Sequence, residues 1–175
     1  MKKYYLIFII FLLVASNSCK EEKKHKKDLD SYNETLIRVN KYLIKEDVER
    51  IKSYIDRKKW NMQQSESGLW YEIYEKSENP GELAKEGDVA TLNFRIELLD
   101  GTLCYTSDSI GSKQFKIAFS DVESGLNEGM KMLTIGDKAR FIMPPYMAHG
   151  LLGDEYKIPA RAIIFYDVEV LDIQK

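Results

Sequence analysis

Alternating hydrophobic and polar residues mark two long stretches in the second half of the chain. Between residues 90 and 98, apolar Ala90, Leu92, Phe94, Ile96 and Leu98 alternate with Thr91, Asn93, Arg95 and Glu97. In the stretch 162–170, one face carries Ile164, Tyr166, Val168 and Val170, and the other carries Phe165, Asp167 and Glu169. A period of two with β-branched and aromatic residues is typical of half-buried strands. Both stretches are therefore predicted to be strands.

Weaker patterns supply the remaining elements of this region. Strands are expected at residues 69–74, 115–119 and 139–143, and Asp100-Gly101 predicts a tight hairpin with a returning strand near 103–105. Residues 107–112 are expected to form a loop. Apolar residues at helical spacing predict one helix of about three turns: Val122, Leu126, Met130 and Leu133. Short connections without βαβ alternation predict an α+β domain, in which an antiparallel sheet packs on a single helix.

Upstream of this domain, residues 33–59 show helical periodicity. Apolar residues recur at intervals of three and four: Leu36, Leu43, Ile44, Val48, Ile51 and Ile55. Because Asp47 is a suitable N-cap for a second helix, the pattern fits one long helix or two shorter ones. We expect a helical spacer over 33–64, followed by the domain over 65–175.

The first residues have the features of an export signal. Lys2 and Lys3 precede the apolar run 4–15, and small residues lead to Cys19. A run of about 12 apolar residues is too short to cross a bilayer, which needs roughly 20. Residues 1–18 are therefore predicted to be a signal peptide. A cysteine directly after the small residues resembles a bacterial lipobox, so Cys19 is expected to carry lipid, including palmitate. An ordinary signal peptide with an incidental cysteine is the alternative.

A charged run follows Cys19 and reads as a polar tether over 19–32. Lipid on Cys19 would hold the chain at the membrane of the cell envelope, and we expect the outer membrane without assigning its face. Composition narrows the function further. With a net charge of -2 and no basic stripe, the chain offers no site for nucleic acid. Cys104 has no partner once Cys19 is acylated, and no Cys/His spacing predicts a metal or a cofactor.

Five short motifs in order carry a resemblance to a known family. They are Asp100-Gly101, residues 125–130, residues 135–139, residues 145–150, and Ile158-Pro159 continuing into 165–169. Across residues 86–172 the chain resembles the FKBP-type peptidyl-prolyl cis-trans isomerases, also called rotamases. That family has an antiparallel sheet curled around a short helix. The lipidated N-terminus with its helical spacer also resembles FKBP-type lipoproteins associated with gliding motility.

The resemblance implies a set of residues around a prolyl-peptide pocket. The substrate pocket is expected to contain Phe94, Tyr105, Phe115, Val122, Leu126, His149, Ile158 and Tyr166, with Cys104 and Glu123 as further candidates. Phe115, Val122 and Ile158 agree with the family pattern, and Phe94 and Tyr166 are close to it. Cys104, Tyr105, Glu123, Leu126 and His149 depart from it, and a different register over residues 104–108 would bring Tyr105 or Asp108 into the pocket.

The implied reaction sets few chemical demands. Rotation about an X-Pro bond breaks no covalent bond and is slow because of a barrier of roughly 20 kcal/mol from amide resonance. An apolar, water-excluding pocket with a few hydrogen-bond donors favours the twisted amide, and His149 is a candidate donor. We expect an isomerase that acts on proline-containing segments of exported proteins and so assists their folding. The alternatives are a weakly catalytic peptide-binding module of a gliding or secretion machine, or a tethered structural lipoprotein.

Overall fold

The computed structural model describes residues 32–175 and divides the chain into two compact units, which meet between Lys45 and Glu46. Residues 1–31 lie outside the described residues, and with them lie the predicted signal peptide, Cys19 and nearly all of the predicted tether. Among residues 32–175, no helix combines the length and the apolar character needed to cross a bilayer.

The N-terminal helix runs over residues 32–58 without a break, so the single-helix alternative holds. In the part that belongs to the first unit, large apolar side chains are exposed by 43–67%: Leu36, Ile37, Val39, Tyr42 and Ile44. Residues 46–58 belong to the second unit, where Ile51, Tyr54 and Ile55 are buried. The domain therefore includes about twenty residues that the sequence had placed in the spacer.

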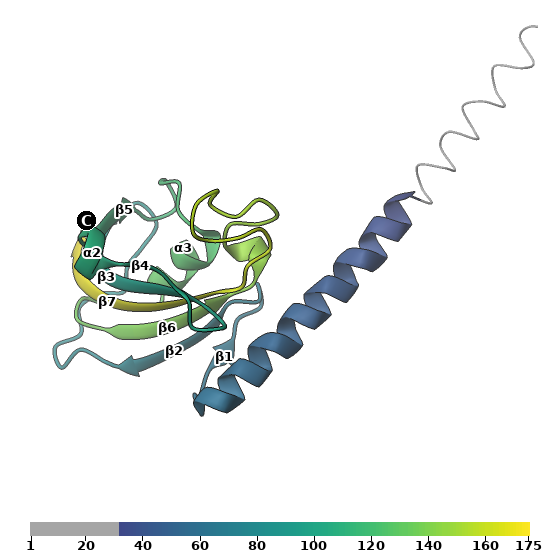
Figure 1. Ribbon diagram of the computed structural model, residues 1–175. Helices are drawn as coiled ribbons and strands as arrows, with labels where there is room; N and C mark the ends of the chain where they lie inside the picture. Colours follow the sequence, from purple (N-terminus) through teal and green to yellow (C-terminus); the bar gives the residue numbers. More distant parts are fainter. Residues whose placement is uncertain (1–31) are drawn as a thin grey trace, which may run out of the picture. The chain divides into compact units, whose positions relative to one another are not determined.

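The second unit is built on one antiparallel sheet. Its strands within the described residues are β1 (Gln63–Gln64), β2 (Trp70–Glu75), β3 (Val89–Leu98), β4 (Leu103–Thr106), β5 (Lys113–Lys116), β6 (Lys138–Met143) and β7 (Ile164–Gln174). The spatial order is β1-β2-β6-β7-β3-β4, and β5 pairs with the first half of β3. Every pairing is antiparallel. The predicted α+β architecture is confirmed (Figure 1).

Three predicted elements differ from the structure. The expected loop at 107–112 contains the one-turn helix α2 (Ser107–Ile110), because the Thr106 hydroxyl accepts a hydrogen bond from the Asp108 N–H. The expected strand at 115–119 is β5, which starts at Lys113 and ends at Lys116, before Ala118 takes a positive φ of 67°. The expected three-turn helix is the shorter α3 (Ser124–Met130), followed by turns in which Met132 and Leu133 bond to carbonyls three residues earlier.

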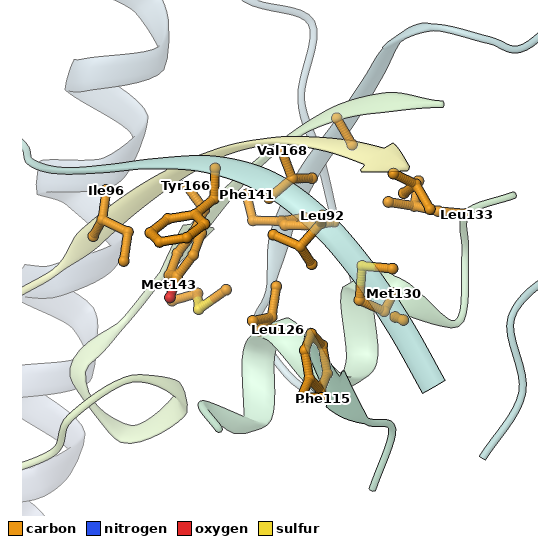
Figure 2. Packing of buried hydrophobic residues seen from close by; sticks show 14 of the residues in the cluster. Leu92, Ile96, Phe115, Leu126, Met130, Leu133, Phe141, Met143, Tyr166 and Val168 are labelled. Atoms are coloured by element: carbon orange, nitrogen blue, oxygen red, sulfur yellow. The ribbon is translucent and has the colours of Figure 1, made fainter. Parts of the chain in front are cut away.

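The main core lies between α3 and one face of the sheet. Leu126 and Met130 of α3 point toward the strand residues Leu92 and Phe141 (Figure 2). Gly129 is required there, because a Cβ on it would lie 2.5 Å from a ring carbon of Phe141. Each large apolar side chain that is fully buried contributes about 1.5–3 kcal/mol relative to exposure. This packing holds α3 close to the strands that form the site described below.

A second cluster covers the opposite face of the sheet. The alternation along β7 sends Tyr166 and Val168 into the main core and Phe165 into this second cluster, beside Ile142 of β6. Ile51, Tyr54 and Ile55 of the helix pack on the same face, and the Trp60 ring stacks on Phe165 with centroids 5.0 Å apart. Hydrophobic side chains therefore pack on both faces of the sheet around Phe165 and Tyr166. The alternating pattern had predicted burial of one face only.

An ion pair connects the helix to the long loop between β6 and β7. The Asp47 carboxylate lies 2.8 Å from the Arg161 guanidinium, and the Asp47 side chain is 6% exposed. Arg161 also donates its backbone N–H to the Gly150 carbonyl at 2.9 Å. The pair therefore fixes the end of the loop that carries His149 and Ile158.

Replacing Asp47 with alanine should lower the free energy of unfolding by about 1–2 kcal/mol. The loss exceeds that of a surface pair because Asp47 is buried, yet stays moderate because Arg161 can reach water. Urea denaturation measures it. Glu49→Ala is the control, because Glu49 forms a solvent-exposed ion pair with Lys52 at 4.0 Å. Its replacement should lower the free energy of unfolding by under about 0.5 kcal/mol. Equal losses in the two variants would show that the Asp47–Arg161 ion pair does not stabilise the loop.

Candidate functional site

A cavity of about 300 Å³ opens between the sheet, the residues around α2 and the long loop. The strands contribute Phe94 and Ile96 from β3, Tyr105 from β4 and Tyr166 from β7. The remaining lining residues come from turns, loops and strand or helix ends: Ile110, Gly111, Ser112, Lys113, Glu123, His149 and Ile158. The volume is at the lower end of the range for small-ligand pockets and suits one or two residues of a peptide.

The strand register creates the apolar wall of this cavity. Phe94 and Ile96 are two residues apart and so share one face of β3. Tyr166 pairs directly with Ile96 on the neighbouring strand, and its ring centroid lies 6.4 Å from that of Phe94. Tilted aromatic rings at this distance attract each other by about 0.5–1.5 kcal/mol beyond their burial. The wall is therefore apolar and closely packed.

Asp154 shapes the loop that forms the opposite wall. One carboxylate oxygen accepts the backbone N–H groups of residues 156, 157 and 158 at 2.7–3.0 Å, and the other accepts the Tyr105 hydroxyl. Burial alone would raise the pKa of Asp154, but these hydrogen bonds outweigh it and lower the pKa to about 2. The loop is thus tied to β4, and Ile158 is held in the cavity wall.

A buried carboxylate gives the cavity a polar corner. Glu123 stands just before α3, and its side chain is 5% exposed. It accepts a hydrogen bond from the Tyr166 hydroxyl at 2.7 Å and lies 3.1 Å from His149 Nε2 and 3.4 Å from the Lys113 ammonium. We call these four residues the Glu123 cluster. Burial would raise the pKa of Glu123, but His149, Lys113 and Tyr166 together lower it to about 2.

The same contacts act in the opposite sense on His149. The neighbouring Glu123 carboxylate raises the pKa of His149 above its ordinary value of 6.5, although partial burial of the ring opposes this. Burial and the Glu123 carboxylate likewise raise the pKa of the Tyr166 hydroxyl, which stays a neutral donor. The cluster therefore contains a carboxylate, an ammonium, a phenol and an imidazole whose pKa is raised by the carboxylate.

We expect the free energy of unfolding to be higher at pH 5.5 than at pH 8 or pH 3. A raised histidine pKa stabilises the fold fully below pH 6.5, and this contribution is lost as the pH rises through the folded-state pKa of His149. The lowered pKa of Glu123 contributes stability above about pH 4.5, which is lost as the pH falls toward 2. Urea titrations at the three pH values measure both. The His149→Gln variant should lose the difference between pH 5.5 and pH 8; a wild-type chain equally stable at these two values would contradict the assignment.

The structure brings together six of the ten residues that the sequence placed in the pocket. Phe94, Tyr105, Glu123, His149, Ile158 and Tyr166 line the cavity. Asp108, which the alternative register over residues 104–108 also offered, is not among the lining residues. Phe115, Leu126 and Cys104 are buried in the main core, and Val122 packs at its edge. None of these four lines the cavity: Leu126 points from α3 toward the sheet, and Cys104 and Phe115 are buried within the core cluster.

Several lining residues escaped the sequence interpretation. Ile96 shares a face with Phe94, so the alternation already contained the signal for it. Lys113 and residues 110–112 lie after a hairpin and carry no local pattern that marks a pocket. Among residues 32–175, no group of three or more His, Cys, Asp or Glu side chains is placed to hold a metal ion.

Comparison with known proteins supplies a family match. The family model for FKBP-type peptidyl-prolyl cis-trans isomerases matches residues 81–171. The chain is 29% identical over 92 residues to peptidyl-prolyl cis-trans isomerase FKBP9 of Rattus norvegicus, covering 52% of this chain and 16% of that protein. It is 31% identical over 118 residues to the FKBP-type peptidyl-prolyl cis-trans isomerase FkpA of Aeromonas hydrophila, covering 67% of this chain and 42% of that protein.

A solved structure agrees in fold. The crystal structure of FkpA from Escherichia coli superposes with a TM-score of 0.61 and 26% identity, covering 76% of this chain and 63% of that one. The chain spans less than half the length of the two relatives above. The matched region contains β3 to β6, β7 as far as residue 171, and all the residues that line the cavity.

Proposed function

The chain belongs to the FKBP-type peptidyl-prolyl cis-trans isomerase family, and we propose on that premise that its cavity catalyses rotation about X-Pro bonds in exported polypeptides. The observation that carries the proposal is the aromatic wall of Phe94, Tyr105 and Tyr166 facing Ile158 across a cavity of peptide size. A proline ring is compact and apolar, and such a wall accepts it without competing hydrogen bonds.

The geometry supports catalysis without covalent chemistry. The planar amide is more polar than the twisted amide, so a dry wall favours the twisted form over the planar one. A donor placed at a carbonyl flanking the X-Pro bond would hold the peptide in the cavity and contribute about 1–3 kcal/mol if water is excluded. His149 lies at the cavity with 28% of its side chain exposed and is the donor we assign to that carbonyl.

A protease-coupled assay on Xaa-Pro peptides tests the function. The expected result is cis-to-trans conversion well above the uncatalysed rate, which corresponds to tens to hundreds of seconds per event. Conversion at the uncatalysed rate would overturn the proposal. Binding of a labelled unfolded protein, measured on the same sample, then decides whether the cavity binds peptide without turnover.

The Phe94→Ala variant should lower kcat/KM about tenfold or more. It removes the ring that packs beside Tyr166 in the apolar wall. A tenfold loss corresponds to about 1.4 kcal/mol of transition-state stabilisation. Rates are compared at a temperature where both proteins are folded, as judged by circular dichroism. Phe119→Ala is the matched control, because Phe119 is 67% exposed and does not line the cavity. An equal loss in Phe119→Ala would place the active surface elsewhere.

A second candidate function keeps the peptide site but reduces turnover. The Glu123 cluster puts charge beside the cavity at a position that departs from the family pattern, and Leu126, which also departs from it, is buried in the core and does not line the cavity. These features favour a peptide-binding module of an envelope machine, of which gliding and secretion assemblies are the examples suggested by the lipoprotein resemblance. The binding measurement above, together with an uncatalysed rate, would select this alternative.

We further propose that lipid on Cys19 anchors the domain to the cell envelope, at the outer membrane. The support is the sequence order of basic start, short apolar run, small residues and cysteine. Lipid chains contribute about 0.8 kcal/mol per buried CH₂, so more than one chain holds a protein stably. Cys19→Ser should move the protein from the membrane fraction to the soluble fraction. A variant that stays in the membrane fraction would rule out this anchor.

A further inference from the structure

Glu123 occupies a position where a helix usually has a capping side chain. It is the N-cap of α3, yet its side chain makes no capping hydrogen bond. Instead the carboxylate turns toward the cavity and meets groups from three other elements: Lys113 of β5, His149 of the long loop and Tyr166 of β7. A carboxylate held away from the helix that begins beside it needs another explanation.

The contact with His149 leaves the two ring nitrogens in different surroundings. Nε2 is buried and lies 3.1 Å from a Glu123 oxygen, although its N–H direction does not make a well-aligned hydrogen bond. The contact is therefore mainly electrostatic, and it favours a proton on Nε2. A histidine with its proton on Nε2 alone has an acceptor at Nδ1, and the doubly protonated ring has a donor there. The charge of the ring thus decides whether Nδ1 donates or accepts a hydrogen bond.

We propose that Glu123 is a positioning residue for His149: it holds the imidazole at the cavity with Nε2 toward the carboxylate and stabilises the doubly protonated ring, so that Nδ1–H donates to a carbonyl of the bound peptide. This inference rests on the proposed function, because it names a role within the same cavity. In this arrangement the Glu123 cluster supplies a hydrogen-bond donor to the peptide, and the donor depends on the Glu123 carboxylate.

The other groups around His149 have opposite effects on its charge. The Glu123 carboxylate and the Asp154 carboxylate of the loop favour the cation, whereas Lys113 of β5 and partial burial of the ring oppose it. Tyr166 of β7 contributes a neutral hydroxyl that also binds Glu123. The net effect raises the pKa of His149, so the cationic ring persists to a higher pH than in an isolated histidine.

Two measurements on the full chain follow from this arrangement. Proton NMR follows the ring signals of the two histidines of the chain, and the His149→Gln spectrum assigns them. His149 should titrate above 6.5 in the wild type. In Glu123→Gln the proton affinity of the His149 ring should be about tenfold lower. The kcat/KM for an Xaa-Pro peptide, and the affinity for a proline-containing peptide, should fall as the pH rises through the same titration. In Glu123→Gln both profiles should move to lower pH.

Glu128→Gln is the matched control. It makes the same chemical change on α3, but Glu128 accepts a hydrogen bond from Ser67 and belongs to no part of the Glu123 cluster. Its titration and its pH profiles should coincide with those of the wild type. If Glu123→Gln fails to fold, the wild-type titration is compared with that of the chain unfolded in urea, and a folded value at or below the unfolded one overturns the proposal.

The outcomes separate the positioning role from the proposed function. An unchanged His149 titration in Glu123→Gln overturns the positioning role whatever the activity. A shifted titration with flat wild-type profiles of both rate and peptide affinity overturns the donor role of Nδ1. A shifted titration with pH-dependent peptide affinity but no isomerisation supports the positioning role of Glu123. Under that outcome only the proposed catalysis is rejected.

Discussion

Replacing Gly153 with alanine is expected to lower the free energy of unfolding by about 2–5 kcal/mol and to reduce peptide isomerisation strongly. Gly153 has a φ of +75°, which costs an alanine about 1–2 kcal/mol. An added Cβ would also lie 2.1 Å from the Ile158 carbonyl oxygen and 2.7 Å from the Pro159 carbonyl carbon. These are backbone atoms, so relief requires the loop itself to move, at roughly 1–3 kcal/mol more.

The movement would displace a wall of the cavity. Ile158 is 2% exposed, and its N–H donates to the Asp154 carboxylate. A shift of the Ile158 carbonyl therefore disturbs both the packing of Ile158 and its hydrogen bond to Asp154. Gly150→Ala provides the comparison in the same loop. Gly150 also has a positive φ, of 62°, but a Cβ there meets no atom within 4 Å. It should cost only the conformational term of about 1 kcal/mol and leave activity nearly intact. Equal effects in the two variants would show that the loop relaxes freely at Gly153.

The strands were predictable because their signals are local. The alternation from Ala90 to Leu98 needs only neighbouring residues to be recognised, and β3 and β7 follow it within one or a few residues. The hairpin at Asp100-Gly101 depends on a glycine that has a φ of 92° in the structure. The same alternation could have placed Ile96 beside Phe94 in the cavity.

Other features depend on contacts that the sequence pattern does not contain. Helix α2 spans four residues and has no hydrophobic period, so only the hydroxyl of Thr106 signals its start. Val122 and Leu133 have helical spacing relative to α3, but Val122 lies in a bend before the helix and Leu133 lies in a turn after it, where its N–H bonds to the Met130 carbonyl. The length of the helix was therefore overestimated from a pattern that turns also satisfy.

The polar corner of the cavity shows the same limit. The cluster combines residues that lie far apart in the sequence and come from four different parts of the fold: Lys113, Glu123, His149 and Tyr166. The family resemblance placed Glu123, His149 and Tyr166 in one pocket, but neither their mutual contacts nor Lys113 was predicted, since a lysine at a strand end carries no local signal of a pocket. Only the packing of the loop against α3 and β7 turns them into one cluster.

Replacing Glu123 with leucine should cost about 2–3 kcal/mol of stability, and Tyr166→Phe should cost about 2 kcal/mol. The first leaves the Tyr166 hydroxyl buried without an acceptor, at a residue with no exposed surface. The second deprives a buried carboxylate of its shortest hydrogen bond. An orphaned buried polar group costs about 1–3 kcal/mol, and more for a charged group.

The double variant Glu123→Leu with Tyr166→Phe should be less destabilised than the sum of the single variants by at least about 1 kcal/mol. Removing both partners leaves neither group unsatisfied, and apolar replacements of buried ion pairs are often neutral or stabilising. Urea denaturation of the four proteins measures the coupling, and strictly additive losses would show that the two side chains act independently. His149 and Lys113 keep 28% and 29% of their side chains exposed, so water can replace their lost partner.

A double variant close to the wild type in stability would also bear on why the charge is present. An apolar corner would then fold as well as the charged one, so stability alone would not account for Glu123. The cost of the charge would have to be offset by what it does for His149. The double variant should accordingly lose the raised His149 titration while remaining folded, which separates the contribution of Glu123 to the cavity from its contribution to the fold.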